Sequence, residues 1–154
     1  MTGIRDLKVL VTGATGFLGT KLTTKLSSSG ARVFPVSRSL GYDLREKAEA
    51  YRAFLESRPD VAVHLAARVG GIGANAENPD IFFAENIRIG MNVVDAAASA
   101  GARLIAISTV CAYPKHCPVP FREEDLWNGY PEETNAPYGV AKRSLLVMCA
   151  AYRV

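Results

Sequence analysis

Short apolar runs alternate with amphipathic stretches along the chain. The apolar runs occupy residues 7–13, 31–37, 60–67 and 102–108. Runs of this length that are rich in Val, Ile and Leu predict buried strands. Apolar residues recur at helical spacing over 17–28, over 45–57 and from Pro79 to about Gly101, and Pro137 begins another helix. Strands that alternate with helices predict an α/β fold, with a doubly wound parallel sheet covered on both faces.

Two features mark the remaining boundaries. Gly30 closes the first helix, and Asn78 precedes Pro79 as a helix N-cap. Residues 113–135 contain four of the chain's eight prolines, which predicts a long loop. In such sheets ligands bind beyond the carboxyl ends of the strands, so the segments that follow the strands are candidate sites.

Composition excludes several classes of protein. At 154 residues the chain fits one domain, with 49% hydrophobic and 21% charged residues. The 18 basic and 15 acidic residues are spread along the sequence, so no nucleic-acid partner is expected. No apolar segment is long enough to predict a membrane span or a secretion signal. Three cysteines without metal-ligand spacing predict no metal site and a reducing, cytoplasmic setting.

The segment GATGFLG lies between the first strand and the first helix. Gly13, Gly16 and Gly19 permit a tight turn, close approach of the backbone to a pyrophosphate, and close helix packing. The first free N–H groups of the helix would then bind phosphate, with Thr15, Phe17 and Leu18 lining the turn. A simple turn is the alternative, but the strand–turn–helix context favours dinucleotide binding in a Rossmann-type fold.

The end of the second strand bears on the choice of cofactor. An acidic residue there would bind the ribose 2′-hydroxyl of NAD, whereas this chain has Arg38 between two serines. A guanidinium suits a 2′-phosphate, so NADP(H) is expected rather than NAD(H). Asp43 and Leu44 would border the adenine. A solvated surface arginine is the alternative interpretation.

Tyr138 lies four residues before Lys142, so on a helix the two share one face. A lysine ammonium beside a phenol should lower the pKa of Tyr138 and suit it to proton transfer at a carbonyl. Thr109 follows the fourth strand and offers a hydroxyl for the same oxygen. A chance Tyr–Lys spacing is the alternative for this pair alone.

Together, the glycine turn and the trio of Thr109, Tyr138 and Lys142 resemble the extended branch of the short-chain dehydrogenase/reductase superfamily, over essentially the whole chain. Within it, AARVGGIGAN, STVCAYPK and ETNAPYGVAK are most similar to the GDP-L-fucose synthase group of NADPH-dependent epimerase/reductases. The resemblance places Thr109 at a position where that group has serine, and Cys111 at its active-site cysteine. It further implies cofactor contacts from Tyr138, Lys142, Leu65, Ala66, Ala67 and Asn86.

Epimerisation beside a ketone requires a base, and a thiolate near cations can supply one, which makes a role for Cys111 intelligible. The resembling group pairs this cysteine with a histidine beyond the Tyr–Lys helix, and neither His64 nor His116 matches that position. A buried structural role for Cys111 is the alternative. Cys117 and Cys149 are expected to be inert.

The resembling group continues into further strands and a substrate-binding domain. We therefore expect residues 1–154 to form an NADP-binding domain that is incomplete at its C-terminus, with the substrate domain absent. The fragment alone should be inactive, and the full-length enzyme should be a homodimer that binds a nucleotide-diphosphate sugar. Another epimerase/reductase of the branch and a non-catalytic NADP(H)-binding module remain alternatives. A 4,6-dehydratase is disfavoured, because Val110 and Cys111 stand where such enzymes carry an acidic pair.

Overall fold

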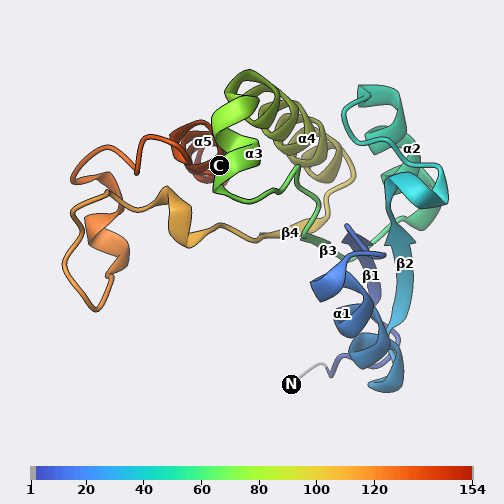
Figure 1. The fold of residues 1–154 in the computed structure, drawn as a ribbon. Helices are drawn as coiled ribbons and strands as arrows, with labels where there is room; N and C mark the ends of the chain where they lie inside the picture. Colours follow the sequence, from blue (N-terminus) through green and yellow to red (C-terminus); the bar gives the residue numbers. More distant parts are fainter. Residues whose placement is uncertain (1–2, 154) are drawn as a thin grey trace. The chain divides into compact units, whose positions relative to one another are not determined.

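The structure is a computed structural model that describes residues 3–153. Its regular elements are drawn in Figure 1. The strands are β1 (Lys8–Thr12), β2 (Arg32–Val36), β3 (Val61–His64) and β4 (Arg103–Ala106). The α-helices are α1 (Phe17–Ser28), α2 (Lys47–Ser57), α3 (Ile72–Glu77), α4 (Pro79–Ser99) and α5 (Ala136–Ala151). Short 3₁₀ turns occur at η1 (Arg38–Leu40), η2 (Val110–Ala112) and η3 (Glu123–Trp127). The predicted alternation of strands and helices is confirmed.

The four strands form one parallel sheet in the order β2-β1-β3-β4. Each step from a strand to its parallel neighbour passes through a helical crossover, which is how parallel strands must be connected. Strand β1, one of the two central strands, is deeply buried, since Leu10 and Val11 have no exposed surface. The predicted doubly wound, Rossmann-type architecture is confirmed.

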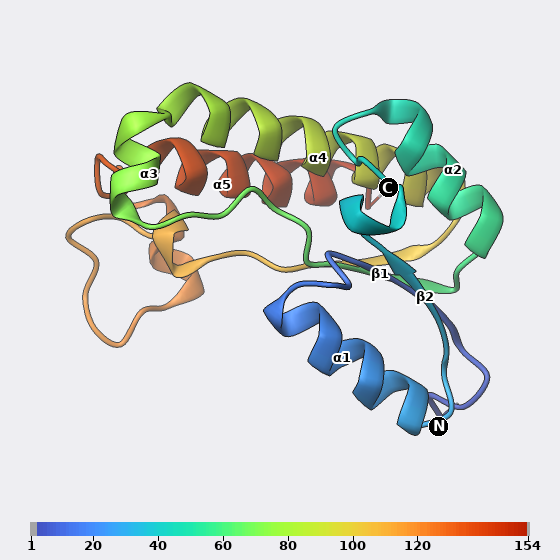
Figure 2. The same cartoon turned by 45° about the vertical axis from the view of Figure 1, so that its right-hand side comes forward.

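Helices cover both faces of this sheet. Figure 2 shows α1 and α2 on opposite sides of the strands. The core on one side consists of Val9, Val11, Ala14 and Val63, and Leu22 and Leu26 of α1 pack against it. The leucine spacing in α1 therefore reflects burial against the sheet, as the sequence pattern indicates.

The chain forms two compact units. The first contains residues 3–67 and 91–107, and so holds the whole sheet, α1, α2 and the second half of α4. The second contains residues 68–90 and 108–153, with α3, the first half of α4 and α5. Within the second unit α5 runs alongside α4 (Figure 2), and an added Cβ at Gly90 would lie 3.1 Å from the Leu145 side chain.

Several boundaries differ from the sequence prediction. The third strand ends at His64, so Leu65, Ala66 and Ala67 belong to the loop beyond it. Helix α3 was not predicted, because the glycines of VGGIGAN hide its helical character. Its Asn75 side chain donates hydrogen bonds to the carbonyls of Gly70 and Gly71, which holds the approach to this short helix. The loop 113–135 contains the η3 turn.

Among residues 3–153, no helix combines the length and the apolar character needed to cross a bilayer. Within the same residues, no group of three or more His, Cys, Asp or Glu side chains is arranged to hold a metal ion.

Candidate functional site

The glycine turn has the geometry that its sequence predicts. Gly13 adopts a left-handed conformation with φ of 68°, and an added Cβ would lie 2.9 Å from the Ala66 nitrogen. An added Cβ at Gly19 would lie 2.1 Å from the Gly13 carbonyl oxygen. A side chain at either position would therefore collide with backbone. The turn, the first turn of α1 and the loop after β3 are packed together at one edge of the first unit.

The first turn of α1 is suited to bind an anion. Gly16 is its N-cap in extended conformation, without a side-chain capping bond, and the first turn contains no acidic residue. The leading N–H groups of a helix lack intrahelical partners and carry the positive end of the helix dipole. Phe17 and Leu18 are exposed, at 84% and 52%. The cradle therefore fits a dinucleotide pyrophosphate.

The loop after β3 is held by a residue that the sequence reasoning missed. The Thr12 hydroxyl, at the end of β1, accepts hydrogen bonds from the backbone N–H groups of Leu65 (3.1 Å) and Ala66 (3.0 Å). Thr12 has no exposed surface. A buried hydroxyl directly before the first glycine was the signal available in the sequence. Two of the predicted cofactor-lining residues are thus fixed by β1 itself.

A chain of hydroxyl groups connects the glycine turn with the segment after β2. The Thr15 and Ser39 oxygens are 3.1 Å apart, and the Ser39 and Ser37 oxygens are 3.0 Å apart. Arg38 lies between the two serines at the start of η1 and is exposed. The structure therefore places Arg38 in the same turn as these hydroxyls, which is a combination suited to an anionic ligand.

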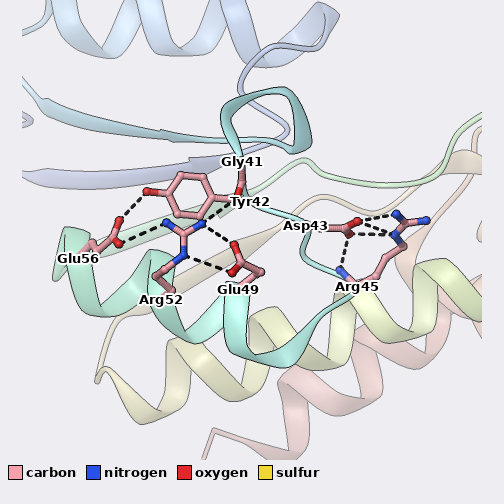
Figure 3. Close-up of polar contacts among 7 residues, drawn as sticks. All are labelled: Gly41, Tyr42, Asp43, Arg45, Glu49, Arg52 and Glu56. Carbon is pink, nitrogen blue, oxygen red and sulfur yellow. Dashed lines mark hydrogen bonds and ion pairs between the residues drawn. The ribbon is translucent and has the colours of Figure 1, made fainter.

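Asp43 is engaged by a neighbouring arginine. The Arg45 Nε atom lies 2.9 Å and 3.1 Å from the two Asp43 carboxylate oxygens, and the Arg45 backbone N–H also donates to Asp43 (Figure 3). The hydrogen bonds from Arg45 hold the pKa of Asp43 below its ordinary value, and the charge of Arg38 contributes in the same direction. This carboxylate is ionised and already paired. Leu44 beside it is buried.

The predicted catalytic residues lie in the second unit. Thr109 is the N-cap of η2, where its hydroxyl accepts a hydrogen bond of 3.2 Å from the Cys111 N–H. An added Cβ at Gly139 would lie 2.2 Å from the Cys111 carbonyl oxygen, so α5 and η2 touch through backbone. The Tyr138 side chain interacts with the Thr109 hydroxyl and with the Cys111 thiol. The structure thus brings Thr109, Cys111 and Tyr138 together.

The expected effect of Lys142 on Tyr138 was wrong for the ligand-free protein. Burial raises the pKa of Tyr138, and the interaction with Thr109 offsets this only in part. Burial also lowers the pKa of Lys142, which is 5% exposed. Burial destabilises the Tyr138 phenolate and the Lys142 ammonium, and this effect outweighs any attraction between the two charges. Burial raises the pKa values of Cys117 and Cys149.

Two further side chains hold the loops of the second unit. Asn86 on α4 accepts a hydrogen bond from the Arg68 N–H (2.9 Å) and donates to the Arg68 carbonyl (3.0 Å). Arg143 on α5, 7% exposed, donates to the carbonyls of Ala112 and Gly129. Sequence reasoning missed Arg143, although a charge four residues after the buried Gly139 indicates that it faces the same surface.

The comparisons with known proteins agree with this geometry. Residues 9–154 match the family described as the NAD dependent epimerase/dehydratase family. The protein named "Probable GDP-L-fucose synthase 1" from Oryza sativa subsp. japonica is 38% identical over 149 residues, covering 96% of this chain and 45% of that protein. A GDP-L-colitose synthase from Yersinia pseudotuberculosis is 34% identical over 145 residues, covering 93% of this chain and 46% of that protein.

A solved structure extends the likeness to three dimensions. The GDP-L-fucose synthetase from Naegleria fowleri bound to NADP superposes with a TM-score of 0.85 at 28% identity, covering 97% of this chain and 50% of that one. The chain spans about half the length of the curated relatives it matches. With the parallel sheet and the Gly13–Gly19 turn, the match over nearly all of the sequence shows that the chain belongs to the NAD dependent epimerase/dehydratase family.

Proposed function

We propose that the chain contains the cofactor-binding and proton-transfer residues of an NADPH-dependent nucleotide-sugar epimerase/reductase, with GDP-4-keto-6-deoxymannose as its substrate. The observation that carries this proposal is the grouping of Thr109, Cys111 and Tyr138 at the η2–α5 contact. A hydroxyl, a thiol and a phenol in one place provide the groups that both halves of the reaction need. A non-catalytic cofactor-binding module would not require the thiol.

The first unit supports NADP(H) as the cofactor. Its residues fit the pyrophosphate at the α1 N-terminus and a 2′-phosphate at Arg38, Ser39 and Thr15. Asp43 is paired with Arg45 and therefore does not supply the free carboxylate with which NAD-binding proteins hold a 2′-hydroxyl. When bound, NADPH supplies the hydride for reduction of the ketone.

Reduction needs a proton for the carbonyl oxygen. The raised pKa of Tyr138 keeps its phenol protonated at neutral pH, so it is able to donate. The Thr109 hydroxyl, next to Tyr138, orients the same oxygen by a hydrogen bond. Lys142, once its ammonium is near the product phenolate, stabilises that charge and lowers the cost of the transfer.

Epimerisation needs a base and an acid at the carbons beside the ketone. The Cys111 thiolate removes the proton from such a carbon, and the negative charge moves onto the carbonyl oxygen, where Tyr138 and Thr109 donate hydrogen bonds. An acid on the opposite face, which in the resembling group is a histidine beyond the Tyr–Lys helix, returns a proton to that carbon, inverts its configuration and restores the ketone. No redox equivalent is consumed in this half of the reaction.

The substrate class rests on the relatives. The GDP-L-fucose synthase and GDP-L-colitose synthase relatives share a GDP-sugar in their names, so the GDP-linked class is better supported than any single sugar. Leu65, Ala66 and Ala67, in the loop after β3 of the first unit, are proposed to line the cofactor, and Asn86 of the second unit is proposed on the resemblance alone. A homodimer and a cytoplasmic location belong to the same proposal and rest on the resemblance alone.

The decisive experiment uses a fusion in which the second half of the rice relative follows Val154. The fusion is incubated with GDP-4-keto-6-deoxymannose and NADPH in D₂O, and both deuterium in the sugar and oxidation of NADPH are measured. We expect Cys111→Ser to suppress deuterium incorporation while leaving part of the reduction. Tyr138→Phe should suppress NADPH oxidation because the proton donor is lost.

Cys117→Ser is the matched control and should leave both rates unchanged. Parental deuterium incorporation in Cys111→Ser would assign the cysteine a structural role. A folded fusion that binds NADPH but catalyses neither exchange nor reduction would contradict the proposed function.

A further inference from the structure

Arg52, on the exposed side of α2, contacts the turn that follows Arg38. Its guanidinium donates a hydrogen bond of 2.7 Å to the Gly41 carbonyl. The centre of the guanidinium also lies 4.2 Å from the centre of the Tyr42 ring, on which it stacks (Figure 3). A planar guanidinium can make both contacts at once, whereas a lysine ammonium cannot.

Two glutamates fix the orientation of this guanidinium. Glu49 and Glu56 lie three residues before and four residues after Arg52, so all three share one face of α2. The nitrogen–oxygen distances are 2.5 Å to Glu49 and 3.3 Å to Glu56. The Tyr42 hydroxyl donates a 2.6 Å hydrogen bond to Glu56, which connects the turn to the same network (Figure 3).

The turn held in this way is the one that carries Arg38. The Gly41 N–H donates to the Arg38 carbonyl (3.0 Å), and the Tyr42 N–H donates to the Ser37 carbonyl (3.0 Å). Gly41 has a φ of 86°, which permits the reversal of the chain after η1. A displacement of Gly41 or Tyr42 therefore moves the backbone of Arg38 directly.

The opposite side of the turn is held by the Ser39–Thr15 hydrogen bond to the glycine turn. The Arg38 side chain is exposed, and its charge acts on the Asp43 carboxylate, which follows Tyr42 at the end of the turn. Both the position from which Arg38 extends and the position of Asp43 are set by the backbone of the turn. That backbone is anchored by hydroxyls on one side and by Arg52 on the other.

We propose that Arg52 is a positioning residue for cofactor specificity: it holds the Arg38 turn so that the Arg38 guanidinium favours a ribose 2′-phosphate over a 2′-hydroxyl. The inference rests on the proposed preference for NADP(H). Arg52 acts through Arg38 and does not contact the cofactor. Its loss should therefore change the discrimination between two cofactors that differ only at the 2′ position.

The test measures the affinities of the 154-residue chain for NADPH and NADH by fluorescence, and for adenosine 2′,5′-bisphosphate and 5′-AMP by calorimetry. The variants are Arg52→Met, Arg38→Met and the double variant. Arg103→Met is the control, because it removes an equal charge from an exposed position on β4. The ratio of affinities within each pair is the readout, since general loss of folded protein lowers both members equally.

We expect Arg52→Met to reduce the preference for the 2′-phosphate about threefold to thirtyfold, in the range of coupling between residues that share a network. Arg38→Met should reduce the preference further, and adding Arg52→Met to it should change nothing more. Arg103→Met should retain the parental ratio.

An unchanged ratio in Arg52→Met would overturn the inference and leave the cofactor proposal intact. A further loss in the double variant would also overturn it, because Arg52 would then act on the ligand directly. Equal affinity of the parent for NADPH and NADH would overturn both the cofactor preference and the inference.

Discussion

The Thr12 hydroxyl oxygen lies 2.8 Å from the Nδ1 atom of His64, its neighbour across the β1–β3 pair, and both side chains are buried. Because this oxygen already accepts the N–H groups of Leu65 and Ala66, its own proton points to Nδ1. This arrangement makes the His64 Nδ1 atom the acceptor of the bond. One hydroxyl links the two central strands to the loop beside the glycine turn.

Thr12→Val, which keeps the shape but removes the hydroxyl, should destabilise the first unit. The two partly buried N–H groups of Leu65 and Ala66 would lose their acceptor, at about 1 kcal/mol each. Thr12→Ser retains the oxygen and is the matched control. Urea denaturation gives the free energy of unfolding, and NADPH titration tests whether the loop after β3 is displaced. Equal stability of the two variants would show that the hydroxyl bonds contribute little.

Gly19→Ala should disrupt the glycine turn, because the new Cβ would lie 2.1 Å from a backbone oxygen that cannot move aside. We expect a loss of about 3 kcal/mol or more and no measurable NADPH binding. Gly73→Ala in α3 is the control, since no atom lies within 4 Å of its added Cβ. Alanine should stabilise that helix by about 0.5–1 kcal/mol. Thermal unfolding of both variants checks the two signs, and a tolerated Gly19→Ala would contradict the close packing.

Arg143→Met should destabilise the second unit by about 1–3 kcal/mol, because the buried carbonyl of Ala112 loses its donor and the bond to the Gly129 carbonyl is lost as well. The Arg143 guanidinium also lies 5.6 Å from the ring of Trp127, the chain's single tryptophan. Tryptophan emission therefore reports both the loss of this contact and the unfolding curve.

Arg122→Met in the same loop is the control for Arg143→Met, as its ion pair with Glu124 is long and exposed. If Arg143→Met has the same unfolding curve and tryptophan emission as the parent, then Arg143 does not connect α5 with the loop.

Lys142→Met should stabilise the ligand-free chain at neutral pH. Burial lowers the pKa of Lys142 in the folded state, so the folded protein binds fewer protons than the unfolded chain between that pKa and the ordinary value. The destabilisation of the folded state by the buried Lys142 ammonium is complete below the folded-state pKa. It decreases as the pH rises toward the ordinary pKa of lysine. The advantage of Lys142→Met should thus shrink with rising pH.

Melting temperatures from pH 7 to 9.5 test the Lys142 effect in a Tyr138→Phe background, which removes the opposing titration of the buried phenol. Lys25→Met, at an exposed position of α1, is the control and should show no such trend. A constant difference between Lys142→Met and its parent across this range would contradict the effect of burial.

The sequence by itself determined the alternation of elements and the glycine turn. Apolar runs that alternate with helical segments are compatible with few arrangements other than a parallel sheet. The left-handed φ of Gly13 is a conformation that glycine adopts without steric cost. The sequence pattern also placed Thr109 and Cys111 directly after a strand and Tyr138 on the next predicted helix. Local pattern suffices for such features, because they depend on residues close in the chain.

Only the tertiary structure decided how these residues are held. The sign of the Tyr138 pKa shift follows from burial by groups distant in sequence, and spacing along a helix could not supply it. Thr12 and Leu65 meet because β1 and β3 are paired, and Arg143 reaches Ala112 because α5 packs on η2. The contact of Arg52 with Gly41 depends likewise on where α2 returns to the turn. Such contacts join segments that are distant in the sequence, and the periodicity of apolar residues gives no information about them.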